Sequence, residues 1–291
     1  MDLGRHLCEQ ALEVDPQYAA PLVDLAHYYC VSTMTQRITS TEGTAKGLGA
    51  AERALTLDST LGEAIGFRAR FRALAEYRWA EALADFSQAL EMNPASSLTA
   101  QGHAVVLTAL NRLPEAIRQQ DHALKADPFS SLNHYVMARL FVHDREYERA
   151  ETHANLAIEL APSSWLANAT LGLVQLRTGR IADAIRSLDT AHRTAPVGFI
   201  ASGWRGCAYV LAGEIPRAEQ ILAELDALGS PVPAAMIYTQ LGNTEAAFDR
   251  LRTAVRGQDF QLYGLQVDSA FDRLRSERQY SDLLGLMNLQ S

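Results

Sequence analysis

The sequence predicts an all-α protein, a right-handed superhelix of stacked antiparallel helix pairs. A proline recurs every 34 residues, and small residues recur at the same step. Within each period, apolar residues follow helical spacing. A period of this length indicates helix–turn–helix units that bury their apolar faces against neighbouring units. The recurring residues are Pro94, Pro128, Pro162 and Pro196, then Ala82, Ala116, Ala150 and Ala184, and finally Ala89, Ala123, Ala157 and Ala191.

Composition excludes several classes of function. The 291 residues carry a net charge of −8, whereas a nucleic-acid or anionic-membrane surface needs a basic stripe. Since the chain has neither a long apolar stretch nor the apolar core of a signal peptide, we expect a cytoplasmic protein with no membrane contact, provided that no membrane segment lies upstream. Cys8, Cys30 and Cys207 are too widely spaced for a disulfide framework or a metal-ligand pair.

The first sixteen residues resemble half a unit. Leu3, Leu7 and Leu12 fall on one helical stripe that ends at Pro16, as in a second helix whose first helix is missing. Because such a half-repeat leaves an apolar face uncovered, we expect a further domain upstream of Met1 in the parent protein. The alternative is that this helix is itself the cap of the array.

The next unit, residues 17–61, is longer than the others. The step from Pro16 to the equivalent Ser59 is 43 residues, and the extra length falls in a Ser-, Thr- and Gly-rich insertion over residues 30–49. The insertion lengthens either the loop or the helices, and the second helix is predicted to resume near Thr44. The glycines of residues 43–49 also allow a phosphate-binding loop, but their spacing differs from G-x-x-x-x-G-K-[ST], so a flexible insertion is favoured.

The remaining chain divides into units of decreasing regularity. Each full unit ends in a proline, which stops the second helix and can start the next one. The last residues lose the repeat pattern and are predicted to cap the array. The predicted units are 62–96, 97–130, 131–164 and 165–198, a degenerate unit 199–228, a short unit 229–258 and the cap 259–291, so the array proper covers 1–258.

These positions resemble the tetratricopeptide repeat family over roughly residues 1–258. The tail beginning Val267-Asp268-Ser269-Ala270-Phe271 is similar to the closing segment of a bacterial group in which such arrays follow a winged-helix DNA-binding domain, a class III adenylyl cyclase domain or a Ser/Thr kinase domain. The resemblance implies a sensory or interaction region. Any DNA-binding or catalytic activity would belong to an upstream domain.

No residue pattern predicts an enzyme, a metal site or a cofactor. His122, His134, His143 and His153 do not match H-E-x-x-H. Cys207 has only Arg205 as a basic neighbour in sequence, so a buried thiol is favoured over a nucleophile.

The resemblance places binding on the concave groove, which the first helix of each unit lines. In the family, ligands meet positions 2, 5, 9 and 12 of each unit, and here these positions are mostly apolar. Chaperone-binding members hold a C-terminal carboxylate with Lys, Arg and Asn at such positions, and this chain has no matching set, so a carboxylate clamp is not expected. We expect the groove to expose at least Phe67, Phe71, Tyr135 and Arg139, although packing between repeats is the alternative. The predicted groove residues are Phe67, Phe71, Gln101, Val105, Tyr135, Arg139 and Leu173.

The sequence therefore predicts a non-catalytic protein-interaction module that binds a peptide or a helix in its groove. Within that class, we expect the sensory or regulatory region of a bacterial signalling or transcription-regulating protein. Two alternatives stay open. One is a scaffold that forms a homo-oligomer through its N-terminal half-repeat, and the other is a small-molecule sensor with a pocket near residues 30–49.

Overall fold

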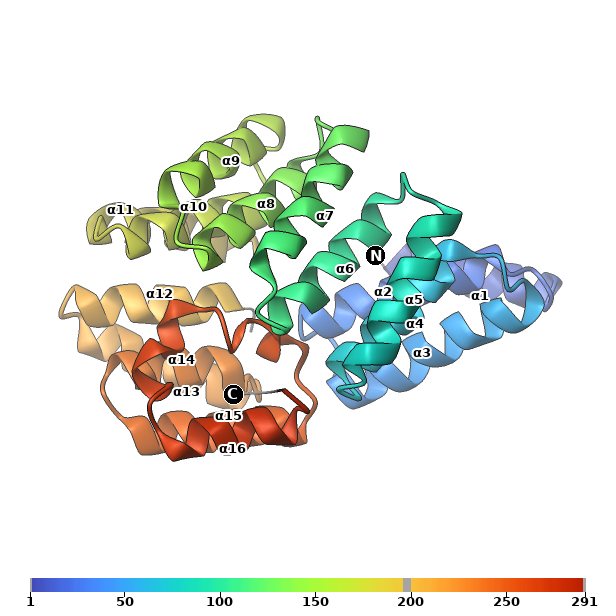
Figure 1. The fold of residues 1–291 in the computed structure, drawn as a ribbon. Helices are drawn as coiled ribbons and strands as arrows, with labels where there is room; N and C mark the ends of the chain where they lie inside the picture. Colours follow the sequence, from blue (N-terminus) through green and yellow to red (C-terminus); the bar gives the residue numbers. More distant parts are fainter. Residues whose placement is uncertain (1, 196–199, 290–291) are drawn as a thin grey trace.

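The computed structural model describes residues 2–195 and 200–289. In this part of the chain every regular element is a helix, and consecutive helices pair and stack along a curved array (Figure 1). The predicted all-α repeat fold is confirmed. Pro196, the predicted end of the unit 165–198, lies outside the described residues.

After α1 (Asp2–Val14), the helices come in pairs, a first and a second helix to each unit. They are α2 (Ala20–Met34) with α3 (Ser40–Leu57), α4 (Gly62–Leu74) with α5 (Trp79–Met92), α6 (Ser97–Ala109) with α7 (Leu113–Ala126), α8 (Ser131–His143) with α9 (Tyr147–Leu160), α10 (Trp165–Arg177) with α11 (Ile181–Thr194), α12 (Ile200–Leu211) with α13 (Ile215–Ala227), and α14 (Pro231–Gln240) with α15 (Thr244–Arg256). The tail holds two short 3-10 helices, η1 (Phe260–Gly264) and η2 (Ser269–Leu274), and then α16 (Arg278–Leu286).

The same local chemistry starts and ends successive first helices. Ser96, Ser130 and Ser164 cap α6, α8 and α10, each accepting a hydrogen bond from the backbone N–H three residues on. At the other end, one residue per unit takes a left-handed φ of 55–78°, which turns the chain into the second helix. These residues lie 34 apart: Tyr77, Asn111, Arg145, Gly179 and Gly213.

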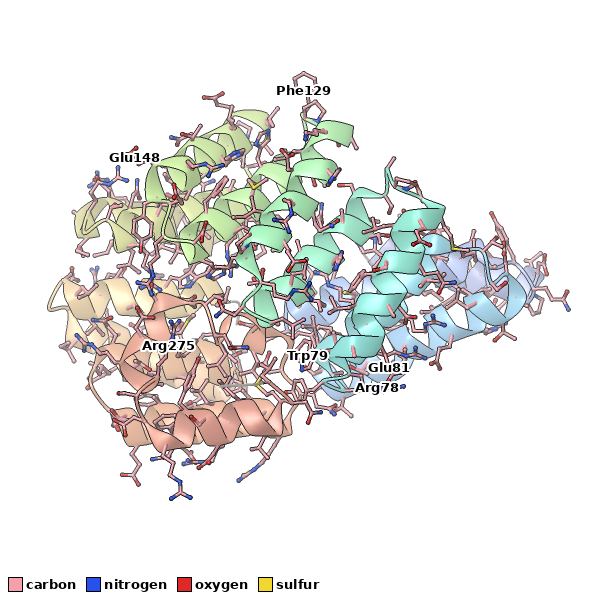
Figure 2. All side chains as sticks on the ribbon, in the orientation of Figure 1. Arg78, Trp79, Glu81, Phe129, Glu148 and Arg275 are labelled. Carbon is pink, nitrogen blue, oxygen red and sulfur yellow. The ribbon has the colours of Figure 1, made fainter. Side chains whose placement is uncertain are left out.

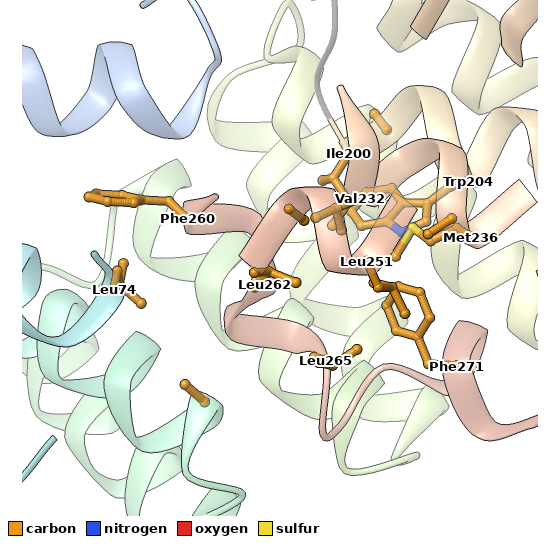
Figure 3. Packing of buried hydrophobic residues seen from close by; sticks show 14 of the residues in the cluster. Leu74, Ile200, Trp204, Val232, Met236, Leu251, Phe260, Leu262, Leu265 and Phe271 are labelled. Atoms are coloured by element: carbon orange, nitrogen blue, oxygen red, sulfur yellow. The ribbon is translucent and has the colours of Figure 1, made fainter. Parts of the chain in front are cut away.

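The core is continuous from α2 to the tail. The recurring alanines are almost completely buried, since they stand where helices approach closely. Large side chains fill the space between units and under the tail, where Trp204 and Met236 lie near Leu251 and Phe271 (Figure 3). Each unit is therefore stabilised mainly by its neighbours.

The insertion in the second unit is helical rather than a flexible loop. α2 extends to Met34 and α3 begins at Ser40, four residues before the predicted start. Gly43 and Gly47 lie inside α3, where a Cβ atom would stand 1.7 Å from Thr33 Oγ1 and 2.1 Å from Phe71 Cζ. These glycines permit close helix packing, so the phosphate-loop alternative is wrong.

Candidate functional site

The tail occupies much of the concave face. Phe260 of η1 packs against Phe71 of α4 with ring centroids 5.8 Å apart, and η1 also lies against α2 and α6. Further along, the Gln266 side chain donates to the Ala109 carbonyl at the end of α6. Arg177 at the end of α10 forms an ion pair of 2.8 Å with Asp268. The tail thus crosses the groove at the carboxyl ends of the first helices.

Local sequence explains the shape of this crossing. Asp259 and Asp268 each accept the backbone N–H two residues on, which starts η1 and η2. Between and behind these turns, the apolar residues Phe260, Leu262, Leu265, Phe271 and Leu274 are buried against the array (Figure 3). At the end of the chain, the indole of Trp79 donates to the Met287 carbonyl at 2.7 Å. Figure 2 labels Trp79 at the edge where α5 begins.

The part of the groove that the tail leaves open is a pocket of about 260 Å³. α6, α8 and α10 supply most of its wall, α2 and α4 supply one side, and Tyr263 of η1 closes it on the side of the tail. Its surface is mainly apolar. The principal apolar residues are Val31, Met34, Leu98, Val105, Leu132, Val136, Leu140, Trp165 and Leu166.

Four of the seven predicted groove residues line this pocket: Gln101, Val105, Tyr135 and Arg139. Val105 and Tyr135 are half-buried, and Gln101 and Arg139 are buried. Gln101 also has a structural role, because its amide donates to Asn133 Oδ1 at 2.7 Å between α6 and α8.

The other three predicted residues do not line the pocket. Phe71 and Leu173 are fully buried, and Phe67 is nearly so, with its ring stacked on His27. The expected exposure of Phe67, Phe71 and Arg139 is therefore wrong. For Phe71 the physical reason is that its ring lies between α3, where Gly47 leaves room for it, and Phe260 of the tail.

Arg139 is the main charged group of the site. Its guanidinium donates to Tyr135 Oη at 3.3 Å, and it lies over the rings of Trp204 and Tyr263 at 4.9 and 5.7 Å. Burial opposes its charge, but Tyr263, Tyr135 and Asp268 outweigh burial, so the pKa of Arg139 is raised and the group stays charged. His143 lies 3.5 Å away, and burial beside Arg139 lowers the pKa of His143 to about 3, so this imidazole is neutral.

Two buried cysteines and a pair of neighbouring histidines are the other candidate reactive groups. Burial raises the pKa of Cys30, and it raises that of Cys207 to about 12, so both are thiols rather than thiolates. His134 and His153 face each other with Nδ1 atoms 2.9 Å apart. Since His134 Nε2 lies 3.0 Å from the Pro128 carbonyl and must donate there, its Nδ1 accepts from His153. No group of three or more metal-ligating side chains occurs in residues 2–195 and 200–289.

The sequence analysis missed Tyr263, Arg70 and His143 as pocket residues. Arg70 and His143 fall outside the four groove positions that the resemblance selects, although both lie on first helices. Tyr263 carries no signal in the sequence, because its place depends on the return of the tail.

These features define the class of protein: a helical-repeat array that presents a concave pocket. The tetratricopeptide repeat family model matches residues 72–131 and 169–233, so these two parts of the chain are tetratricopeptide repeats. No curated protein matches it in sequence. None of the described helices is both long and apolar enough to span a bilayer.

Several solved structures share the fold. A tetratricopeptide repeat protein from Parabacteroides merdae is 13% identical with a TM-score of 0.56, over 93% of this chain and 98% of that chain. The Cut9–Hcn1 hetero-tetramer of the APC/C is 15% identical with a TM-score of 0.65, over 97% and 52%. The human IFIT1 dimer with m7Gppp-AAAA is 14% identical with a TM-score of 0.59, over 84% and 65%. At these identities the likeness is one of fold alone.

Proposed function

We propose that this chain is a non-catalytic protein-interaction module that takes an apolar segment of a partner polypeptide, a peptide or a helix, into its concave pocket. The pocket itself carries the proposal. It is an apolar depression between the first helices of successive units, the surface on which stacked repeats bind. Leu132 lines it and is 41% exposed, so an apolar group can reach the wall from solvent.

The amino-acid sequence of the tail supports a regulatory role for this module. Its similarity to the closing segment of bacterial regulators supports a sensory or regulatory region of a signalling or transcription-regulating protein. In that role, binding of a partner to the array regulates another part of the parent protein.

Selection of peptides from a displayed random library tests the proposal. We expect selected peptides to share an apolar anchor and to lose binding to Leu132→Asp, which places a charge on the pocket wall. Leu160→Asp is the matched control, because Leu160 in α9 is 39% exposed and lies outside the pocket. Peptides that bind both variants equally would contradict binding in the pocket.

Self-association is a second candidate, and α1 favours it. Leu3 and Leu7 are 70% and 55% exposed on α1, whose main packing partner among the described helices is α2. A pair of exposed leucines on one face suits a helix–helix contact with a second copy. Light scattering over a concentration series, with Leu3→Glu and Leu7→Glu combined, distinguishes a dimer through α1 from a monomer.

A further inference from the structure

The pocket is positively charged although the protein is acidic. Its wall contains the guanidinium groups of Arg70 and Arg139 and two histidines, and none of the described residues that line it is an Asp or a Glu. The pKa of His27 is lowered by burial and by Arg70, and that of His143 is lowered to about 3, so both imidazoles are neutral at pH 7. The two arginines therefore set the charge of the site, against a net charge of −8 for the chain.

Arg139 lacks a carboxylate of its own. The nearest acidic influence on it is Asp268, but that carboxylate forms its ion pair with Arg177 at 2.8 Å. The buried Arg139 and the half-buried Arg177 thus share a single carboxylate, so this cluster holds one more positive than negative charge. Arg139 makes its remaining contacts with the neutral groups of Tyr135, His143, Trp204 and Tyr263.

Burial is the strongest effect that opposes the charge of Arg139, although its neighbours keep the group charged. Arg139 is 4% exposed, and its Nε atom has no hydrogen-bond acceptor among the described residues. A buried charge is best stabilised by a counter-ion together with hydrogen bonds. A ligand that brings a negative charge to Arg139 would add an ion pair that the described residues do not give this group.

Arg70 of α4 is a second donor on the same pocket. It is half-buried, it contacts the Cys30 thiol, and its Nε atom also lacks an acceptor in the described part of the chain. No ion pair of Arg70 is found among the described residues, although Glu63 lines a small neighbouring cavity together with Arg70.

We propose that this pocket binds a small amphipathic carboxylate, with the carboxylate on Arg139 and the apolar body against Leu98, Val105 and Leu132. The volume of the pocket limits the apolar part of the ligand. For comparison, an engineered apolar cavity of about 150 Å³ takes up benzene. The pocket of about 260 Å³ therefore accommodates a chain of about eight carbons or two fused rings. The planar guanidinium group of Arg139 can donate two parallel hydrogen bonds to a carboxylate, and the single negative charge of the carboxylate is complementary to the positive charge of Arg139. The inference rests on the proposed function in one respect, because both need the pocket to be open to solvent.

Paired ligands provide the test. Octanoate and 1-octanol both have an unbranched chain of eight carbons and differ in the charge of the terminal group. Isothermal titration calorimetry measures the affinity of each for the full chain. We expect octanoate to bind about 10- to 100-fold more tightly than 1-octanol, the range of one charge-assisted hydrogen-bonded contact. Equal affinities, or no saturable binding of octanoate, would overturn the proposal.

Variants locate the site. Arg139→Met keeps the length of the side chain and removes its charge, so it should bind octanoate and 1-octanol with similar affinity. Val105→Trp should fill the pocket and abolish binding of both ligands. Arg186→Met, an exposed arginine of α11 outside the pocket, is the control for net charge. Thermal melting first establishes that each variant is folded. Octanoate binding that survives unchanged in a folded Val105→Trp or Arg139→Met would place it elsewhere and overturn the proposal.

The two proposals fail separately. If selected peptides require Leu132 and octanoate binds no more tightly than 1-octanol, the interaction-module proposal stands and the carboxylate-site proposal fails. If octanoate binds more tightly than 1-octanol and no selected peptide depends on Leu132, the interaction-module proposal fails. The carboxylate-site proposal then stands, and the array is identified as a small-molecule sensor.

Discussion

The side-chain amide of Gln36 donates a hydrogen bond of 3.2 Å to Asp259 Oδ2, across 223 positions of sequence. The same amide accepts a hydrogen bond from the Ser230 hydroxyl through its oxygen. Gln36 lies in the connection between α2 and α3, so the insertion of the second unit reaches the start of α14 and the start of η1. This contact joins the N-terminal part of the array to its tail, which gives the lengthened unit a structural role.

The pH dependence of this junction can be predicted from Asp259. Burial raises its pKa to about 6, against the smaller opposing effects of the Gln261 N–H and Gln36. Because the folded state holds the proton more tightly than the unfolded state, stability falls as pH rises from about 4 to about 6 and stays lower above that range. We expect Asp259→Asn to remove this slope, which amounts to roughly 3 kcal/mol for a shift of about two pKa units.

The measurement is the midpoint of urea unfolding of both proteins at pH 4, 5, 6 and 7. Parallel pH profiles for the two proteins would mean that Asp259 keeps an ordinary pKa. A slope of opposite sign that Asp259→Asn removes would mean that the native state favours the carboxylate.

Trp79 is predicted to hold the end of the chain in place. Trp79→Phe keeps a ring but removes the donor to the buried Met287 carbonyl, which should cost about 1–3 kcal/mol. Hydrogen exchange should become faster in α16 while the amides of α8 keep their protection. Arg78→Ala is the neighbouring control, since the ion pairs of Arg78 with Glu76 and Glu81 are solvent-exposed (Figure 2). Equal exchange of α16 in both variants would show that this hydrogen bond does not retain the tail.

Two glycines of α3 give a matched pair. Gly47→Ala would place a Cβ atom 2.1 Å from Phe71 Cζ, so Phe71 and with it Phe260 must move. We expect a loss of about 1–3 kcal/mol, the usual cost of overpacking. Gly49→Ala meets nothing within 4 Å and should stabilise α3 by about 0.5–1 kcal/mol. Thermal melting measures both variants. A change of the two melting temperatures in the same direction would contradict this packing.

Asp268 is predicted to be the most sensitive carboxylate of the tail. Despite burial, Arg177, His143 and Arg139 lower its pKa, so its stabilising contribution is present above the unfolded-state pKa and is lost as pH falls through the lower folded-state value. Asp268→Asn leaves Arg177 and Arg139 without an ionised neighbour and should cost about 3–5 kcal/mol. Asp272→Asn should cost under about 1 kcal/mol, because the ion pairs of Asp272 with Arg145 and Arg275 are both partly exposed to solvent. Similar losses in the two variants, measured by urea unfolding at pH 7, would contradict the distinction.

Part of the candidate site could be predicted from the sequence. The resemblance to the tetratricopeptide repeat family selects groove positions on the first helices, and of the residues at these positions Gln101, Val105, Tyr135 and Arg139 line the pocket. The same reasoning selected Phe71 and Leu173, which are buried. Helical spacing identifies the side of a helix that faces inward, but it carries no information about a distant segment that covers this side.

The repeat architecture can be predicted from the amino-acid sequence alone, because each unit is specified by contacts within itself and with adjacent units. Small residues at close approaches, serine caps and apolar spacing are local signals, and they recur often enough to be read from one chain. The way in which the tail packs onto the array depends on long-range contacts that the folded chain makes. The path of residues 258–289 depends on contacts such as Phe71 with Phe260, Trp79 with Met287 and Gln36 with Asp259. These contacts join positions about 190–220 residues apart, have no period in the sequence, and turn an open groove into a pocket with a charged floor.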